Sequence, residues 1–540
     1  MISRIIKKLR SRKISYEKWY KRHQVTNETL KKQKSAIKEW KRQPVIGVCI
    51  IPKNVSDAER EMTIQSIRNQ TYDKWTLCTW NHGKIIESAN EIATEWIAFV
   101  NEGDCLAPDA LYEMLKAAFV KENVELLYSD EDQMTEDRKK HMNPQFKPDF
   151  NMDLLRSTNY MGHLLLIKTS LLLNLEATSA YDLVLCCVDR TDKIVHVPKL
   201  LYHAGKMQEN IDAETDKKAI EAHLQRNLLA AKVENTKIPG CYRVKYEVQD
   251  QELISIIIPN KDEHETLKRC IESVLKSTYK RYEIIIVENN SKHSDTFAYY
   301  EELTGTAYKA DSAMEGILPN GNRVCVVTWK DIFNYSAINN FGTAYAQGKY
   351  LLLLNNDIEI ITKDWLEELL GHCQRKDVGI VGCKLLYPDE TIQHAGVGIG
   401  LGGIANSMFV GMNASENGYC NRAGIQTNYS AVTAACMMIK RSLYEQVGGV
   451  TEELAVAYND IDLCLKAGKL GYRIVYTPYA KAFHYESKSR GKENTPEKQT
   501  RLERESRYML EKWKDIFKNG DPYYNPNLSK QHMDYSLDWS

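Results

Sequence analysis

The chain has 540 residues, of which 43% are hydrophobic and 27% charged, and its basic and acidic side chains are equal in number. This length favours two or more domains, and the apolar content excludes a chain that is disordered over most of its length. The thirteen cysteines form no C-x-x-C pair. The spacing typical of a zinc site is therefore absent, and free thiols in a reducing cytosol are expected.

The first 44 residues are strongly basic. They carry fifteen Lys or Arg and three Asp or Glu, a net charge of +12, which leaves −12 on the rest of this neutral chain. Four apolar residues recur there at helical spacing, and a basic amphipathic helix can lie on an anionic membrane. We expect a cytoplasmic protein whose residues 1–14 touch the inner membrane surface reversibly; a solvated helix packed on the next domain is the alternative. The apolar residues are Ile2, Ile5, Ile6 and Leu9.

An internal repeat organises the rest of the chain. Residues 50–54 and 71–75 both resemble the residues found 207 positions later. Residues 95–100 resemble residues 349–354, at a larger offset. Because two separate matches share one offset, the sequence predicts a duplication with insertions in its second half, and units of this size are domains rather than solenoid repeats.

The local pattern of the second half is α/β. Residues 253–258 and 282–287 are apolar runs typical of buried strands, and residues 265–277 between them have helical spacing. Strand, helix and strand within about 35 residues predict a parallel, buried sheet. Ligands of such sheets bind outside the carboxyl ends of the strands. The polar residues that follow the predicted strands are residues 260–262, 288–291 and 355–357.

Those strand ends suit a nucleotide. Asp262 and Glu288 can accept hydrogen bonds from a base or a ribose. The first strand is not followed by G-x-G-x-x-G and no Walker A sequence occurs, so phosphate binding would have to go through a metal. Asp357 follows a buried strand and is the natural anchor for Mg²⁺. Each residue alone could be a turn or cap residue, but three successive strand ends weaken that alternative.

Seven segments of the second half form a recognisable set: residues 259–262, 287–291, 333–340, 355–357, 387–396, 459–463 and 483–487. Together they resemble the family 2 glycosyltransferases of the GT-A fold, most closely the two-domain bacterial type of rhamnan and O-antigen synthesis, over about residues 16–540. The resemblance implies two tandem GT-A domains of the α/β class. It also implies transfer of a sugar from a nucleotide-diphosphate donor to a cell-surface polysaccharide or lipid-linked glycan. No nucleic-acid partner is expected.

The resemblance also implies roles for single residues. Asp460 matches the catalytic base, and Asp357 and His484 match the residues that hold Mg²⁺ or Mn²⁺. Asn355 stands where the family's D-x-D motif has its first carboxylate. Residues implied to bind the nucleotide sugar are Pro259, Asp262, Glu288, Asn290, Asn340, Asn355 and Asn356, and those on the acceptor side are Thr433 and Asp462.

The roles agree with elementary chemistry. An inverting transfer needs a base for the acceptor hydroxyl and positive charge on the departing diphosphate. Asp460 begins a predicted helix, where the dipole favours an ionised carboxylate. The alternative is that Asp460 and Asp462 are only helix caps. For the whole protein, the alternative is a non-catalytic, nucleotide-sugar-binding scaffold for other transferases.

The repeat provides an internal control. The first half has Gly103 at the position matched to Asp357 and Ala180 at that matched to Asp460, and Asn81 matches Glu288. We therefore expect a degenerate first domain without catalysis, although Glu102 and Asp104 could form a rearranged metal site. The tail predicts a helix that packs on the second domain, followed by an aromatic loop near its active-site mouth. We therefore expect a basic helical segment over residues 1–44 and a degenerate GT-A-like domain over residues 45–245. The catalytic GT-A domain is expected over residues 246–494, followed by the C-terminal helix and tail over residues 495–540.

Overall fold

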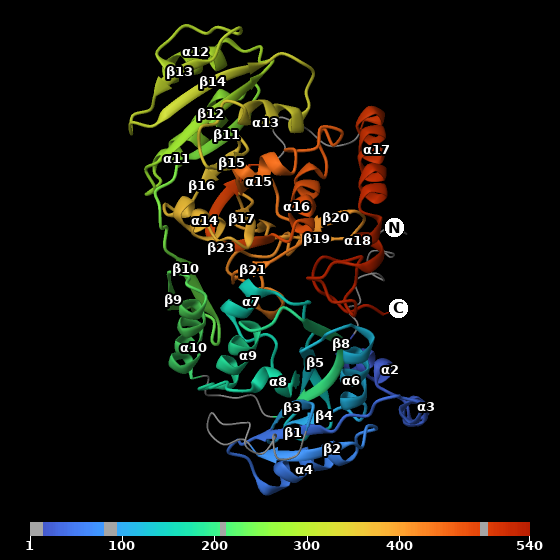
Figure 1. The fold of residues 1–540 in the computed structure, drawn as a ribbon. Coiled ribbons are helices and arrows are strands. Elements are labelled where there is room, and N and C mark those ends of the chain that lie inside the picture. The colour runs from blue at the N-terminus through green and yellow to red at the C-terminus, as the bar shows by residue number, and fades with distance from the viewer. Residues whose placement is uncertain (1–14, 80–93, 206–211, 486–494, 540) are drawn as a thin grey trace. The chain divides into compact units, whose positions relative to one another are not determined.

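The computed structural model describes residues 15–79, 94–205, 212–485 and 495–539 (Figure 1). Two compact units are present. The first comprises the chain up to Arg243 with Pro522–Ser529 and Tyr535–Ser540, and the second comprises Val244–Asp521 with Lys530–Asp534. The helix expected over residues 1–14 lies outside the described residues, as do Asn81, Glu486 and Ser487.

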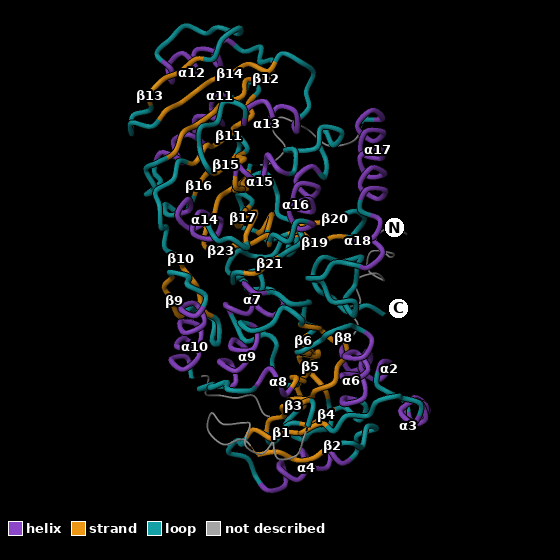
Figure 2. Tube along the Cα trace, in the orientation of Figure 1, coloured by secondary structure: helices purple, strands orange, loops and turns teal. Residues whose placement is uncertain are grey.

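The first unit has a central eight-stranded sheet with helices around it (Figure 2). The strand order is β2-β1-β3-β7-β5-β8-β4, and β6 pairs with β5. The strands are β1 (Ile46–Ile51), β2 (Trp75–Thr79), β3 (Trp96–Asn101), β4 (Cys105–Leu106), β5 (Leu126–Met134), β6 (His141–Gln145), β7 (Leu165–Lys168) and β8 (Ile194–Ala204); β9 (Ala231–Asn235) and β10 (Tyr242–Tyr246) form a separate pair. The helices are α2 (Tyr16–His23), α3 (Asn27–Lys38), α4 (Asp57–Arg68), α6 (Ala110–Val120), α7 (Met152–Ser157), α8 (Thr169–Leu172), α9 (Ala180–Val188) and α10 (Ala213–Arg226).

The second unit has an eleven-stranded sheet of order β13-β14-β12-β11-β15-β22-β17-β23-β16, to which β18 and β21 add. Its strands are β11 (Ile254–Asn260), β12 (Tyr282–Asn289), β13 (Met314–Ile317), β14 (Arg323–Trp329), β15 (Tyr350–Leu354), β16 (Ile358–Ile360), β17 (Val378–Leu386), β18 (Ile392–His394), β21 (Thr427–Asn428), β22 (Cys436–Lys440) and β23 (Arg473–His484); β19 (Val397–Ile399) pairs with β20 (Ala405–Ser407). Its helices are α11 (His264–Leu275), α12 (Ser294–Thr304), α13 (Tyr335–Thr343), α14 (Trp365–Cys373), α15 (Arg441–Gln446), α16 (Asn459–Lys469), α17 (Pro496–Lys512) and α18 (Lys514–Asn519).

The two sheets repeat one another strand for strand. The order β2-β1-β3-β7-β5-β8-β4 of the first corresponds to β12-β11-β15-β22-β17-β23-β16 of the second, with the same parallel and antiparallel pairings. The predicted parallel pairing of β11, β12 and β15 is confirmed, whereas each sheet as a whole is mixed, because β7 and β22 run antiparallel to both of their neighbours. The short apolar runs of these reversed strands have the composition of buried strands, so periodicity does not reveal their direction.

Burial explains why the central strands are apolar on both faces. Four of the seven residues of β11 are isoleucines, and all four are fully buried. Ile254, Ile256 and Ile258 point to one face of the sheet. They share one core with Leu352 and Leu354 of β15. Among the described residues, no helix combines the length and apolar character needed to cross a bilayer. The thirteen cysteines are present as thiols rather than disulfides.

The tail forms the predicted helix, which packs on α16 through Asp462. The Asp462 carboxylate is fully buried. Lys512 Nζ lies 2.8 and 3.0 Å from its two oxygens, the Trp513 indole N–H donates to Oδ1 at 2.8 Å, and the Thr451 hydroxyl donates to Oδ2. Both oxygens are therefore engaged. Asp462, expected on the acceptor side, is instead the anchor of the C-terminal helix.

The aromatic loop after that helix makes its contacts in the first unit. Pro522–Ser529 belongs to this unit, where Asn525 Nδ2 donates to both oxygens of the buried Asp130 at 3.0 and 2.9 Å. The ring centroids of Tyr524 and Tyr535 lie 5.2 Å apart in the same unit. Asn525 thus provides the donors that a buried carboxylate requires, and a position of the loop at the active-site mouth of the second domain stays a prediction.

Replacing the anchor should cost stability. Asp462→Asn removes the charge that Lys512 contacts, and we expect the free energy of unfolding to fall by about 2 kcal/mol, less than for a fully buried pair because Lys512 is partly exposed. Urea unfolding measures the change. The exposed Asp515 of α18 offers a matched control, since Asp515→Asn should leave stability within about 0.5 kcal/mol of the parent. Equal stability of the two variants would contradict the anchor.

Candidate active site

The carboxyl ends of β11, β12 and β15 meet as the sequence predicts. Asn356, after β15, donates its side-chain N–H to Asn260 Oδ1 at 2.7 Å. Asp262, after β11, accepts from the backbone N–H groups of Lys292 and His293 at 2.7 and 2.9 Å. Burial raises the pKa of Asp262, but these two N–H groups outweigh it and hold the pKa below its ordinary value. The strand ends thus form one interlocked edge with an ionised carboxylate.

Two residues predicted to bind the nucleotide sugar, Glu288 and Asn340, form hydrogen bonds within the protein. Glu288 is only 1% exposed, and its oxygens accept from the Ser291 backbone and hydroxyl and from the Tyr300 hydroxyl at 2.5–2.7 Å. Asn340 exchanges hydrogen bonds with the backbone of Val450. These two side chains therefore shape loops, because their polar atoms are already paired inside the protein.

The remaining predicted residues stay near the edge. Asn290 is exposed and has a positive φ of 55°, and its side chain donates to the Asp331 carbonyl at 2.9 Å. Pro259 lies within β11 opposite Val287 of β12. Asn290, Asp262 and Asn356 are thus the predicted residues that the fold leaves at the rim of the strand ends, whereas Pro259 shapes the strand below them.

Strand pairing brings Asp357 and His484 together although they are far apart in sequence. Ile358 of β16 pairs with His484, the last residue of β23, which places the preceding Asp357 beside the histidine. Asp357 Oδ1 lies 3.1 Å from His484 Nε2. This oxygen is buried and has no hydrogen-bond partner. The pair predicted to hold a metal is therefore in contact.

The hydrogen-bond partners of the two ring nitrogens show which of them faces Asp357. His484 Nδ1 lies 2.5 Å from Gln393 Oε1, so Nδ1 is the donor of this hydrogen bond. Asn355 Nδ2 is 3.4 Å from Nε2 on the other side of the ring. Nε2 and Asp357 Oδ1 thus face each other, one an imidazole nitrogen and the other a carboxylate oxygen. Two such atoms fit a divalent cation, which accepts one carboxylate and one imidazole as ligands.

Asp460 lies at the start of α16 with its carboxylate turned toward β22. Oδ2 accepts from the Ala434 backbone N–H at 3.2 Å and Oδ1 accepts from the Ile461 N–H at 2.8 Å. Burial raises the pKa of Asp460, and the hydrogen bonds from Ala434, Ile461 and Thr433 only partly offset this. The helix dipole alone predicted an easily ionised group. Desolvation is the larger effect here and makes Asp460 a stronger base.

A line of contacts joins Asp460 to the metal pair. The Tyr335 hydroxyl lies 3.5 Å from the Ala434 carbonyl and donates to Asn355 Oδ1 at 2.9 Å. Asn355 in turn approaches His484, and its backbone N–H donates to the Ala435 carbonyl at 3.0 Å. The predicted base and the predicted metal ligands therefore lie in one connected region, held by α13, β15, β22 and α16.

Three residues of this site were quoted as motif members but assigned no role from the sequence. Tyr335 connects Asn355 with the loop before β22, and Gln393 accepts a hydrogen bond from His484 Nδ1. Burial and the neighbouring His484 lower the pKa of His394 to about 3, so this ring is neutral, and its Nε2 faces the Thr433 N–H at 3.4 Å. Their place within the motif segments 333–340 and 387–396 was the available signal, but their contacts depend on the tertiary structure.

The first unit resembles this site only in part. Cys105 of β4 pairs with His203 just as Ile358 pairs with His484, so Asp104, rather than Gly103, occupies the position of Asp357. The sequence alignment was wrong by one residue, because the turn after β3 is one residue longer. Asp104 accepts from Tyr202 and from the Gly205 N–H, so both its oxygens are used.

The raised pKa gives a stability test. A carboxylate whose pKa is raised by folding stabilises the fold when protonated, at low pH, and loses that contribution as the pH rises through the raised pKa. Asp460→Asn removes this loss. We therefore expect the Tm of the variant, relative to the parent, to increase as the pH goes from about 4 to 8, measured by calorimetry. A variant that falls further behind the parent with rising pH would contradict the raised pKa.

Comparison with known sequences agrees with this geometry. Residues 255–448 match the family model for glycosyl transferase family 2. The chain is 36% identical, over 92% of its length, to the uncharacterized protein y4gI of Sinorhizobium fredii, of which it covers 58%. It is 31% identical, over 93% of its length, to the O-antigen biosynthesis protein RfbC of Myxococcus xanthus, of which it covers 42%. The chain thus spans about half the length of these relatives.

A solved structure is also similar. It is a mannosyltransferase from Pyrobaculum calidifontis, in complex with GDP-Man and Mn²⁺, with 15% identity and a TM-score of 0.33 over 45% of this chain and 60% of that chain. A TM-score this low supports no comparison of residues. The sequence match is sufficient by itself: the second unit contains a glycosyltransferase domain of family 2, with the α/β fold expected from its motifs.

Proposed function

We propose that the chain is an inverting glycosyltransferase that moves a sugar from a nucleotide-diphosphate donor onto a growing cell-surface polysaccharide or lipid-linked glycan. The observation that carries this proposal is the line of contacts from Asp460 through Tyr335 and Asn355 to the Asp357–His484 pair. A base and a cation site at fixed separation are what such a transfer requires. The family match and the O-antigen relative support the substrate class.

In this proposal Asp460 takes the proton of the acceptor hydroxyl as it attacks the anomeric carbon. Its raised pKa strengthens the base, and Thr433 beside it belongs to the acceptor side. Asp262, Asn290 and Asn356 orient the nucleoside at the strand ends. Asp357 and His484 would hold Mg²⁺ or Mn²⁺, which neutralises charge on the departing diphosphate.

The first unit has no such role in the proposal. Ala180 begins α9 at the position that Asp460 has in α16, and an alanine cannot take a proton. Transfer is therefore assigned to the second unit alone. A scaffold that binds nucleotide sugars without transferring them is the competing outcome of the test below.

The test uses the full chain with UDP-, GDP- and dTDP-sugars. We expect one donor to raise the Tm in the presence of Mn²⁺, because binding to the folded state appears directly as stabilisation. Asp357→Asn should abolish the Mn²⁺-dependent part of the shift. Asp460→Asn should keep donor binding but lower donor hydrolysis and transfer at least about 100-fold, as expected for loss of a general base.

Each outcome separates the alternatives. Binding with no turnover in the parent would favour the scaffold, and undiminished turnover in Asp460→Asn would remove the base assignment. Asp515→Asn, on the exposed face of α18, is the matched control and should leave binding and turnover unchanged.

We also propose that the protein works at the inner membrane surface. The +12 charge of residues 1–44 would be attracted to anionic lipid by up to about 1 kcal/mol for each cation near the surface, screened by salt. Removing residues 1–14 should therefore lower binding to anionic liposomes in sedimentation assays, while transfer to a soluble acceptor is kept. Equal sedimentation of the full and shortened chains would contradict this contact.

A further inference from the structure

A second cluster of metal-ligand side chains lies in the first unit, outside the proposed active site. Among the described residues, Asp132, His141 and His203 are the one group of three that offers ligand atoms all within 4.8 Å of one another. They come from β5, β6 and β8, three neighbouring strands of one sheet. Asp132 and His203 are buried, and His141 is partly exposed. The sheet therefore holds the three side chains together from residues far apart in the chain.

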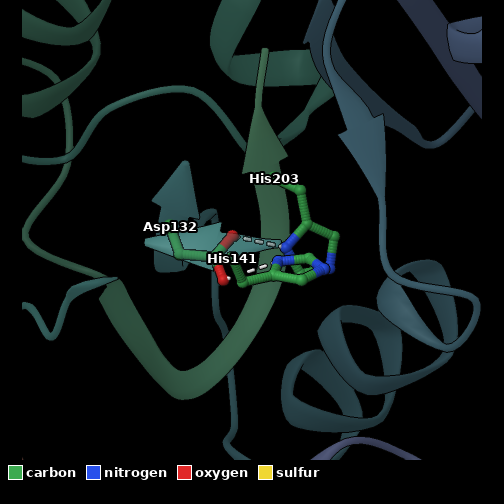
Figure 3. A group of neighbouring side chains, drawn as sticks. All are labelled: Asp132, His141 and His203. Atoms are coloured by element: carbon green, nitrogen blue, oxygen red, sulfur yellow. Dashed lines mark hydrogen bonds and ion pairs between the residues drawn. The ribbon is translucent and has the colours of Figure 1, made fainter. Parts of the chain in front are cut away.

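The hydrogen bonds of the cluster define its charge. His203 Nδ1 lies 2.6 Å from Asp132 Oδ1, and His141 Nδ1 lies 2.9 Å from Oδ2 (Figure 3). Burial raises the pKa of Asp132, but the two histidines outweigh it and hold the pKa below its ordinary value. The carboxylate is therefore ionised and accepts one ring proton from each histidine. Both rings are turned with their other nitrogen away from Asp132 (Figure 3).

The N-terminal helix α2 completes the surroundings. The Tyr16 hydroxyl donates to Asp132 Oδ2 at 2.5 Å, and the Tyr20 ring stacks on His141 with centroids 3.8 Å apart. A cavity of about 460 Å³ in this unit is lined by His203 together with Tyr20 and other residues of the first unit. The cavity gives small ions a route to the buried histidine, which a metal site requires.

The second unit shares one ligand position with this cluster, because His203 pairs with Cys105 of β4 as His484 pairs with Ile358 of β16. Asp132 has no such counterpart, since β17 ends in Leu385 and Leu386 whereas β5 continues through Asp132 to Met134. The first unit thus builds a different ligand set around a histidine position that both units have. We propose that Asp132, His141 and His203 bind a transition-metal cation of the Zn²⁺ class.

The donor set determines the class of ion. Two imidazoles and one carboxylate suit Zn²⁺, Co²⁺ or Ni²⁺, whereas Mg²⁺ prefers oxygen ligands and keeps several waters. On binding, each ring gives up the Nδ1 proton shared with Asp132 and carries its single proton on Nε2 instead, so both rings stay neutral ligands and the ion takes the place of the shared protons. The ion would also fasten α2 to the sheet, because Tyr16 and Tyr20 contact the same carboxylate and ring.

The test uses the full chain carrying Asp357→Asn, so that the second unit's cation pair is removed, after treatment with a chelator. Calorimetric titration should give one equivalent of bound Zn²⁺ and no comparable binding of Mg²⁺. His141→Gln keeps a hydrogen-bond donor for Asp132 but is a poor ligand, and it should weaken Zn²⁺ binding by at least about tenfold. The bound ion should raise the Tm of the parent and not that of His141→Gln.

The matched control is His163→Gln. His163 lies in the same unit and contacts the Glu131 carboxylate at 3.2 Å, outside the cluster, so its replacement should leave Zn²⁺ affinity unchanged. Co²⁺ in place of Zn²⁺ should give visible bands without thiolate charge transfer, which separates histidine ligands from the thirteen cysteines. Absence of stoichiometric Zn²⁺ binding, equal affinity in the His141 and His163 variants, or a thiolate spectrum would each overturn the proposal.

Discussion

Asp357 Oδ1 and His484 Nε2 lie 3.1 Å apart at the pairing of two strands that are distant in sequence, and the proposed chemistry depends on this contact. The β16–β23 pairing sets their positions, while Gln393 accepts from the other ring nitrogen of His484 and fixes the orientation of the imidazole. A buried carboxylate oxygen is costly unless a positive charge or a donor lies beside it. The proposed cation would meet this need at Asp357.

The same desolvation acts on Asp460. Burial raises its pKa, while the Ala434 and Ile461 N–H groups keep the carboxylate usable as an acceptor of protons. In a medium of low dielectric constant, charges influence one another over larger distances than in water. The contacts through Asn355 and Tyr335 would therefore couple the proposed cation at Asp357 to the proposed base Asp460.

The sequence predicted the strands and helices better than the side-chain contacts between them. The apolar runs that became β11, β12 and β15 and the start of α16 were found by periodicity, because burial on both faces requires such runs. Asp357 and His484 came from the family resemblance and lie in contact. Asp462 was misjudged, since nothing local indicates that Lys512 and Trp513 occupy its oxygens. The hydrogen bonds of Glu288 with Tyr300 were likewise not evident from the sequence, and its nucleotide contact stays a prediction. The strand direction and the one-residue slip at Asp104 likewise depend on pairing between distant segments.

The position of the C-terminal segment has a consequence for how the protein is made. Lys512 and Trp513 complete the packing of α16, which begins with Asp460, and Asn525 supplies the donors for Asp130 in the first unit. Domains of a nascent chain fold as they emerge from the ribosome. Neither unit can form its full set of buried hydrogen bonds until residues 512–525 have been synthesised. The two units are therefore completed almost together, and a ribosome that stops before residue 512 releases two unfinished units rather than one finished domain.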